Sequence, residues 1–243
     1  MSNKIFEQNQ RYYDAEASVY DGNRYMTTAG KRVEAFHKRI IDESLQGRVV
    51  TGNKVLELGC GTGRLMSHLI DRSYQLHGID LSPAMLEVAR KHLKVSGESV
   101  ELHQGNVLEL PFSEQSFRAV YSILVINLIP DFRSAFKEVA RILEPDGLFL
   151  FNVPNIVSIY CLGGLYVNAR RRTVTTNNVG HRYSHWFSPS EWRGALIDAG
   201  FTVECVVGQP PHIRWIDNAD PINAEGVGLL FSKSIYILAR RVR

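Results

Sequence analysis

The sequence predicts an α/β fold: a seven-stranded, mostly parallel sheet whose last strand is antiparallel, with helices on both faces. Apolar, strand-like runs alternate with helical segments over residues 54–151, and this alternation is typical of a parallel sheet covered by helices. After a predicted helix at residues 189–199, two further strand-like runs follow with no helical pattern between them. We expect these two strands to pair as an antiparallel hairpin on an edge of the sheet.

The elements follow one another along the chain. The first 50 residues are expected to be helical, because Phe36 and Ile40 fall on one apolar stripe at helical spacing. Pro83 lies just inside a later helix start, where Ser82 is a suitable N-cap, and residues 145–147 supply the turn into the fifth strand. The expected strands are residues 55–58, 75–79, 100–103, 119–123, 148–151, 201–207 and 231–240. The expected helices of this part are residues 64–71, 83–93, 132–143 and 189–199.

Composition narrows the class of protein. A chain of 243 residues suits one well-cored domain and is short for two. The net charge of +3 is spread along the chain, which gives no sign of a nucleic-acid partner. No stretch approaches the roughly 20 apolar residues of a membrane span. Cys60, Cys161 and Cys205 have no paired spacing, so we expect neither disulfides nor a metal site. We expect a cytoplasmic monomer or homodimer.

A glycine-rich loop follows the first expected strand. Gly59, Gly61 and Gly63 allow a sharp turn and the close approach of a ligand, and the helix that follows offers free N–H groups to an anion. A dinucleotide fingerprint needs a glycine at the sixth position, where this chain has Arg64, so the loop disfavours NAD. Asp80 follows Gly59 by 21 residues, a spacing suited to binding both hydroxyls of a ribose.

Three segments carry a family resemblance: Glu57-Leu58-Gly59-Cys60-Gly61-Thr62-Gly63, Gly78-Ile79-Asp80-Leu81-Ser82 and Gly105-Asn106-Val107. Together they closely resemble class I S-adenosylmethionine (SAM) methyltransferases, in particular the small-molecule branch that includes the ubiquinone and menaquinone methyltransferases. The resemblance implies a Rossmann-like fold and SAM as the cofactor. It also implies one domain with an N-terminal helical lid (1–50), a cofactor-binding core (54–151), a substrate-side insertion (152–187) and a C-terminal helix and hairpin (188–243).

The same resemblance implies a set of residues around the cofactor: Tyr20, Glu57, Gly59, Cys60, Gly61, Gly63, Asp80, Leu81, Met85, Asn106, Val107, Ser122, Ile123 and Leu124. Glu57 would lie near the ammonium group of the methionine part, and Asp80 would bind the ribose. Asn106 replaces the usual aspartate beside the adenine amino group, and an asparagine oxygen accepts the same hydrogen bond. Met85 would pack on the adenine or serve as ordinary core.

Candidate catalytic residues are Tyr13, His181 and His185. A methyl acceptor that carries a proton needs a general base, and imidazole titrates near neutral pH. Either histidine could serve, or could be an ordinary loop residue. Tyr13 and Tyr20 could form a lid over the cofactor or pack the first helix against the sheet.

The expected reaction is methyl transfer from SAM to a small-molecule acceptor by direct in-line displacement. The apolar residues 156–167 suggest an apolar acceptor, although a buried helix would show the same pattern. No nucleic-acid partner is expected, because residues 126–130 lack the motif of adenine-amino methyltransferases. The alternatives are a non-catalytic SAM-binding subunit that acts with a partner, or methylation of a macromolecular substrate; a dehydrogenase is disfavoured by Arg64.

Overall fold

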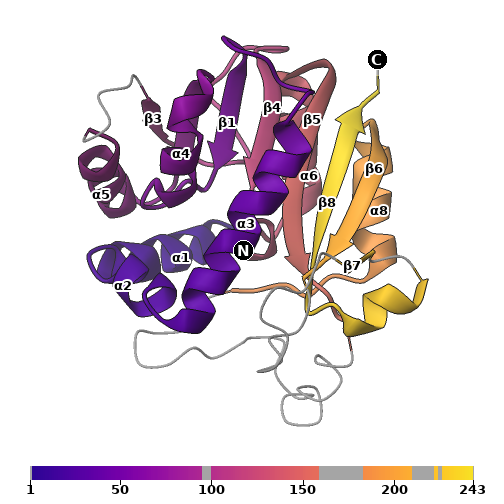
Figure 1. Ribbon diagram of the computed structural model, residues 1–243, viewed down its shortest axis with the longest axis horizontal. Helices are drawn as coiled ribbons and strands as arrows, with labels where there is room; N and C mark the ends of the chain where they lie inside the picture. The colour runs from indigo at the N-terminus through magenta and orange to yellow at the C-terminus, as the bar shows by residue number, and fades with distance from the viewer. Residues whose placement is uncertain (1, 95–99, 159–182, 210–221, 224–225, 243) are drawn as a thin grey trace.

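The structure is a computed structural model, and it describes residues 2–94, 100–158, 183–209, 222–223 and 226–242. The described residues form one eight-stranded sheet in the order β3-β2-β1-β4-β5-β8-β6-β7 (Figure 1). The strands are β1 Lys54–Leu58, β2 Gln75–Asp80, β3 Glu101–Gln104, β4 Phe117–Ser122, β5 Leu143–Pro154, β6 Phe201–Gly208, β7 Ile222–Asn223 and β8 Ser234–Arg241. The seven predicted strands are present, and β7 adds a two-residue edge strand that the sequence did not indicate.

The strand directions confirm the predicted sheet. Strands β1 to β5 pair in parallel, and β8 runs antiparallel to both of its neighbours, β5 and β6. The predicted hairpin forms, since Phe201 of β6 lies opposite Arg241 of β8. However, β8 lies inside the sheet against β5, and β6 lies toward the edge. Residues 235–239 of β8 are buried without alternation, which is the pattern of a central strand.

Two strand boundaries differ from the prediction. Strand β5 begins at Leu143, and the turn predicted at residues 145–147 is an irregularity within this strand, where the pairing with β4 shifts register. Asp146 there adopts a φ of +60°. Strand β8 begins later than predicted, because Gly226–Phe231 form a short 3-10 helix. Turn-forming residues therefore bend a strand here rather than end it.

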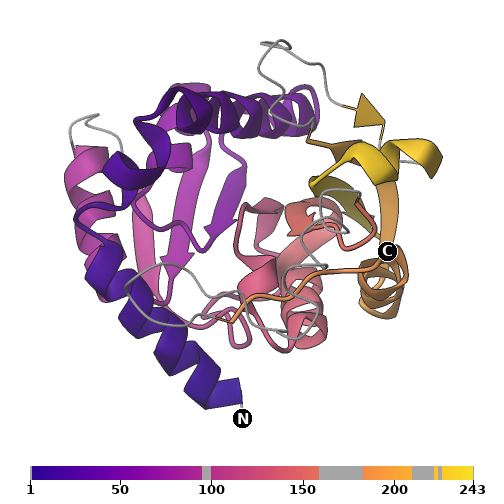
Figure 2. The same cartoon turned by 90° about the horizontal axis from the view of Figure 1, so that it is seen from below.

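Helices cover both faces of the sheet, as predicted. Ile41, Met66 and Leu86 pack in a core on one face, and Phe136 and Trp192 pack in a core on the other. Figure 2 shows α3 and α6 on opposite sides of the strands. The helices are α1 Ser2–Glu16, α2 Tyr20–Tyr25, α3 Thr28–Leu45, α4 Arg64–Leu69, α5 Pro83–Lys94, α6 Phe132–Ile142 and α8 Pro189–Asp198. None of the helices within these described ranges is long and apolar enough to span a bilayer.

Side-chain caps define the starts of helices α5 and α8. The Oγ atom of Ser82 accepts a hydrogen bond from the N–H of Met85 at 3.1 Å, which confirms the predicted N-cap of α5. Ser188 and Glu191 form a reciprocal capping box at the start of α8. These caps satisfy N–H groups that the first helical turn leaves without partners.

The N-terminal helices α1 and α2 lie across the carboxyl ends of the parallel strands (Figure 1). Side chains of this region bond to the loops that follow β1, β2 and β4. The donor–acceptor pairs are Asn9 Nδ2 to Leu128 O (3.0 Å), Ser82 Oγ to Asp14 Oδ1 (2.5 Å) and Thr62 Oγ1 to Asp21 Oδ1 (3.0 Å). The helices therefore cover the edge of the sheet at which ligands bind in α/β proteins.

Candidate active site

A cavity lies where the loops after β1, β2, β3 and β4 meet helices α1 and α2. Its lining combines apolar side chains with a few polar groups, as is typical of small-molecule sites. The predicted cofactor residues that line it are Tyr20, Glu57, Gly59, Cys60, Gly61, Asp80, Leu81, Met85, Asn106, Val107, Ile123 and Leu124. The structure thus brings segments from four strand ends to one site.

The glycine loop forms one wall of this cavity. Gly59 and Gly61 have φ values of +68° and +53°, a region that favours glycine. A Cβ atom on Gly59 would lie 2.4 Å from Cγ2 of Val125, so this glycine allows two loops to approach closely. A Cβ atom on Gly61 would meet no atom within 4 Å. Because Gly61 also lines the cavity, its missing side chain leaves space for a ligand against the backbone.

Two predicted residues lie outside the cavity lining. Gly63 is the N-cap residue of α4, and a Cβ atom there would contact Leu93 and Ala89 of α5. This glycine therefore allows α4 and α5 to pack closely. Ser122 is fully buried, and its hydroxyl donates a hydrogen bond to the carbonyl oxygen of Leu58 at 3.2 Å. These positions do not support the prediction that the two residues contact the cofactor, because protein atoms rather than open cavity surround Gly63 and the Ser122 hydroxyl.

Asp80 ends β2 and holds the glycine loop in place. Its Oδ2 atom accepts a hydrogen bond from the N–H of Gly61 and its Oδ1 atom one from the N–H of Ser82, both at 2.8 Å. Burial raises the pKa of Asp80, and these N–H groups oppose the shift. Each carboxylate oxygen accepts about two hydrogen bonds. Both oxygens of Asp80 therefore keep an acceptor position, which suits the two hydroxyls of a ribose.

A second acid, Glu57 of β1, lines the cavity while only 3% exposed. The hydroxyl of Tyr121 on β4 donates a hydrogen bond to its Oε2 atom at 2.9 Å. Burial raises the pKa of Glu57 to about 8, although this hydroxyl and the charge of Arg64 oppose the rise. A cation at this end of the cavity would favour the ionised carboxylate. Glu57 thus fits the ammonium group of a methionine part.

The opposite end of the cavity suits an aromatic base. Leu81 and Met85 present apolar surface, and Met85 is also buried in the protein. The Oδ1 atom of Asn106 accepts a hydrogen bond from the N–H of Leu108 at 3.0 Å, so this oxygen keeps one acceptor position for an amino group. Leucine and methionine side chains beside an amide oxygen provide both stacking and a polar contact for adenine.

Leu124 lines the cavity in a strained backbone conformation. Its φ is +65°, which costs a non-glycine residue roughly 1–3 kcal/mol. The buried side chain of Asn152 stabilises this turn, because its Oδ1 atom accepts a hydrogen bond from the N–H of Leu124 at 2.6 Å. Such strain is common at ligand sites. The family resemblance implies that Leu124 lies beside the cofactor, and the strained turn is consistent with a positioned residue there.

The candidate catalytic residues separate in space. Tyr13 lines the cavity, with its ring 6.1 Å from the ring of Tyr20. His185 does not line it: its Nε2 atom lies 3.1 Å from Oε1 of Glu191, and its ring stacks on Phe132. His185 is therefore part of the α6–α8 packing rather than a base facing the cavity. His181 lies outside the described residues. Among the described residues, no histidine lines this cavity.

Several cavity residues were not expected from the sequence. Phe6, Asn9 and Gln10 of α1 line the cavity on the same helical face as the expected Tyr13, at spacings of three, four and seven from Phe6. This helical period was the available signal. The others are Tyr25, Thr62, Arg64, Leu65, Ser82, Gly105, Val125, Leu128 and Ile129. Arg64, predicted only as an obstacle to NAD, stacks 3.7 Å over the ring of Tyr25.

Comparisons with known proteins agree with this site. Residues 56–151 match the methyltransferase domain family. The chain is 30% identical over 148 residues to the demethylmenaquinone methyltransferase of Bacillus velezensis, covering 59% of this chain and 58% of that protein. It is 29% identical over 174 residues to the ubiquinone biosynthesis O-methyltransferase of Stutzerimonas stutzeri, covering 69% and 71%. The matched part thus spans less than two thirds of the length of the first of these relatives.

Solved structures share the fold. A SAM-dependent methyltransferase from Thermotoga maritima aligns over 95% of this chain and 99% of its own, with a TM-score of 0.65 and 20% identity. A SAM-dependent methyltransferase from Clostridium acetobutylicum aligns over the same shares with a TM-score of 0.67 and 18% identity. These likenesses show that the chain has the fold of these SAM-dependent methyltransferases. The chain thus carries a match to the methyltransferase domain family over residues 56–151 and is similar in sequence to quinone methyltransferases.

Proposed function

We propose that this protein transfers a methyl group from SAM to a small apolar acceptor of the quinol class. Two curated relatives carry names that refer to menaquinone and ubiquinone synthesis, which supports an aromatic, hydroxylated acceptor. The observation that carries the proposal is a cavity lined by predicted cofactor residues and also by a group of apolar side chains, here called the apolar extension. The extension is made by Phe6, Val125, Leu128 and Ile129.

Helix α1 connects the two parts of this cavity. In the middle of the helix, Asn9 donates a hydrogen bond to the carbonyl oxygen of Leu128, beside the apolar extension. Near its end, Asp14 accepts a hydrogen bond from Ser82, beside Asp80. One side of this helix would therefore contact both the acceptor and the nucleotide. Holding both reactants under one cover favours reaction, because it fixes their relative orientation and excludes water.

When bound, SAM supplies a methyl group on a positively charged sulfur, so no metal ion or covalent enzyme intermediate is required. The protein binds the ribose through Asp80, neutralises the ammonium group through Glu57 and keeps the backbone of Gly61 against the ligand. A quinol acceptor loses one proton in the reaction, and Tyr13 and His181 are the proposed groups to hold or pass on that proton. Tyr13 lines the cavity.

The test has two stages. Titration calorimetry with S-adenosylhomocysteine should show micromolar binding, and NADH, as the comparison, should show none. Reduced naphthoquinol and catechol-type quinols carrying a short isoprenoid chain are then supplied with SAM, and products are read by mass. Failure of S-adenosylhomocysteine to bind the folded protein would refute the cofactor site. Binding without turnover of any quinol would refute the acceptor class and favour a macromolecular substrate or a partner-dependent subunit.

A further inference from the structure

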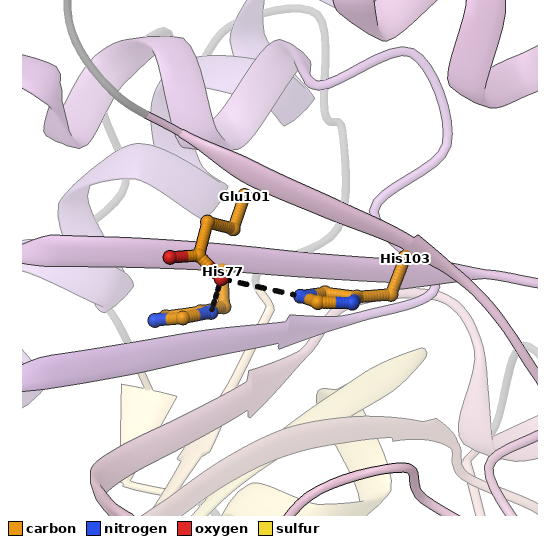
Figure 3. Close-up of side chains that lie close together, drawn as sticks. All are labelled: His77, Glu101 and His103. Atoms are coloured by element: carbon orange, nitrogen blue, oxygen red, sulfur yellow. Dashed lines mark ion pairs between the residues drawn. The ribbon is translucent and has the colours of Figure 1, made fainter.

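A group of three side chains lies outside the cofactor cavity, on the neighbouring strands β2 and β3. His77 lies opposite Glu101 in the register, and His103 follows Glu101 by two residues, so all three side chains point to one face of the sheet. The two imidazole rings stack, with centroids 6.0 Å apart and an interplanar angle of 13°, and Glu101 lies between their nitrogen atoms (Figure 3). None of the three residues lines the cofactor cavity.

The distances are too long for hydrogen bonds and suitable for a shared ion. His77 Nδ1 lies 3.4 Å and His103 Nε2 lies 3.7 Å from Oε2 of Glu101, and the three ligand atoms all lie within 4.8 Å of one another. In a tetrahedral zinc site with bonds near 2.0–2.2 Å, neighbouring ligand atoms are about 3.4 Å apart. The three atoms therefore need only small movements to bind one metal ion.

Two buried nitrogen atoms in this group lack hydrogen-bond partners. Nδ1 of His77 and Nε2 of His103 are both buried from solvent, and neither has a hydrogen-bond partner among the described residues. The residue His77 is only 6% exposed. A buried polar atom without a partner is costly, so a native structure normally supplies one. A metal ion would satisfy both nitrogen atoms at once.

We infer that His77, Glu101 and His103 form a binding site for a divalent transition metal, with Zn²⁺ as the ion that best fits the ligands. Two neutral imidazoles and one carboxylate form a common protein ligand set for zinc. The side chain of Glu101 is 62% exposed, so water can complete the coordination from that side.

The surroundings indicate a structural role for this metal. The rings of Phe112 and Phe117 pack edge-on against His77, at 6.3 and 5.2 Å between centroids, and fix its orientation. Strand β3 has four residues and pairs with β2 at the edge of the sheet. A metal held by both strands would cross-link this short edge strand to its neighbour. The site is separate from the cofactor cavity, so metal binding should raise stability without being required for cofactor binding.

The sequence alone did not indicate this site. Cysteine spacing argued against a metal, and His77 and His103 belong to strands that only the sheet brings together. The test is titration calorimetry of the metal-free full chain with ZnCl₂, with Co²⁺ absorption as a second readout of coordination. Glu101→Gln and His103→Ala are the test variants, since neither side chain is fully buried. His68→Ala is the matched control, because His68 is a half-buried histidine paired with one carboxylate, Asp42.

We expect one zinc ion per chain, at least tenfold weaker binding in both test variants and unchanged binding in the control. Zinc should also raise the midpoint of thermal unfolding, and a chelator should reverse the rise. The unaltered chain should bind S-adenosylhomocysteine equally well with and without zinc. The proposal is overturned if the unaltered chain shows no saturable binding, or if Glu101→Gln and His103→Ala bind zinc as tightly as it does.

Discussion

Replacing Gly61 by alanine separates the cost of an unusual backbone from the cost of filling the cofactor cavity. Gly61 has a φ of +53°, and a Cβ atom there would meet no protein atom within 4 Å. The left-handed backbone alone costs alanine about 1–2 kcal/mol. The same cost applies to Gly52, which has a φ of +82°, equally open surroundings and no place in the cavity lining. Gly52→Ala is therefore the matched control.

The two variants should differ only in ligand binding. Urea unfolding should show similar losses of about 1–2 kcal/mol in the free energy of unfolding for both. In Gly61→Ala, the added methyl group occupies space that the cofactor needs, and overpacking of this kind costs about 1–3 kcal/mol. Titration with S-adenosylhomocysteine should thus show about 5- to 150-fold weaker binding. Unchanged affinity in Gly61→Ala, or an equal loss in Gly52→Ala, would refute the assignment of this loop to the cofactor.

Three further predictions concern the acids of the site. Asp80→Ala should weaken the binding of S-adenosylhomocysteine strongly. It should also lower the free energy of unfolding by about 1–3 kcal/mol, because two N–H groups lose their acceptor. Unchanged affinity by calorimetry would exclude Asp80 from the ribose site. The pKa of Glu57 rises from 4.5 to about 8 on folding, so its contribution to stability is full below pH 4.5 and is lost as the pH rises through about 8. Denaturant titrations at several pH values should show that the unaltered protein loses stability with rising pH more steeply than Glu57→Gln does. If the two proteins lose stability in parallel, this prediction is contradicted. Asp14→Ala removes the acceptor of the Ser82 hydroxyl. Amide hydrogen exchange should therefore become faster in α1 but not in the sheet. If α1 exchanges at the same rate in this variant as in the unaltered protein, the contact does not hold the helix.

The cofactor half of the site was largely predictable because its signals are local. A strand that ends in closely spaced glycines forms its loop from consecutive residues, and an acid at the end of the next strand must lie beside that loop. Gly59, Gly61 and Asp80 accordingly line the cavity. Ser122 and Gly63, also predicted to contact the cofactor, lie outside the cavity lining, because sequence position fixes a neighbourhood but not which atoms fill it. His185 likewise lies outside the cavity lining, where its ring contacts Glu191 and Phe132.

By itself, the sequence determined the fold class, the alternation of strands and helices, the glycine loop and the acid at the end of the following strand. These depend on apolar periodicity and on backbone preferences of neighbouring residues, which act over a few residues. Only the tertiary structure decided that a face of α1 closes the cavity, that Tyr121 bonds to Glu57, and that His77 and His103 face one carboxylate. Each of these contacts joins residues distant in the chain, and their meeting depends on strand order, register and packing rather than on any local pattern.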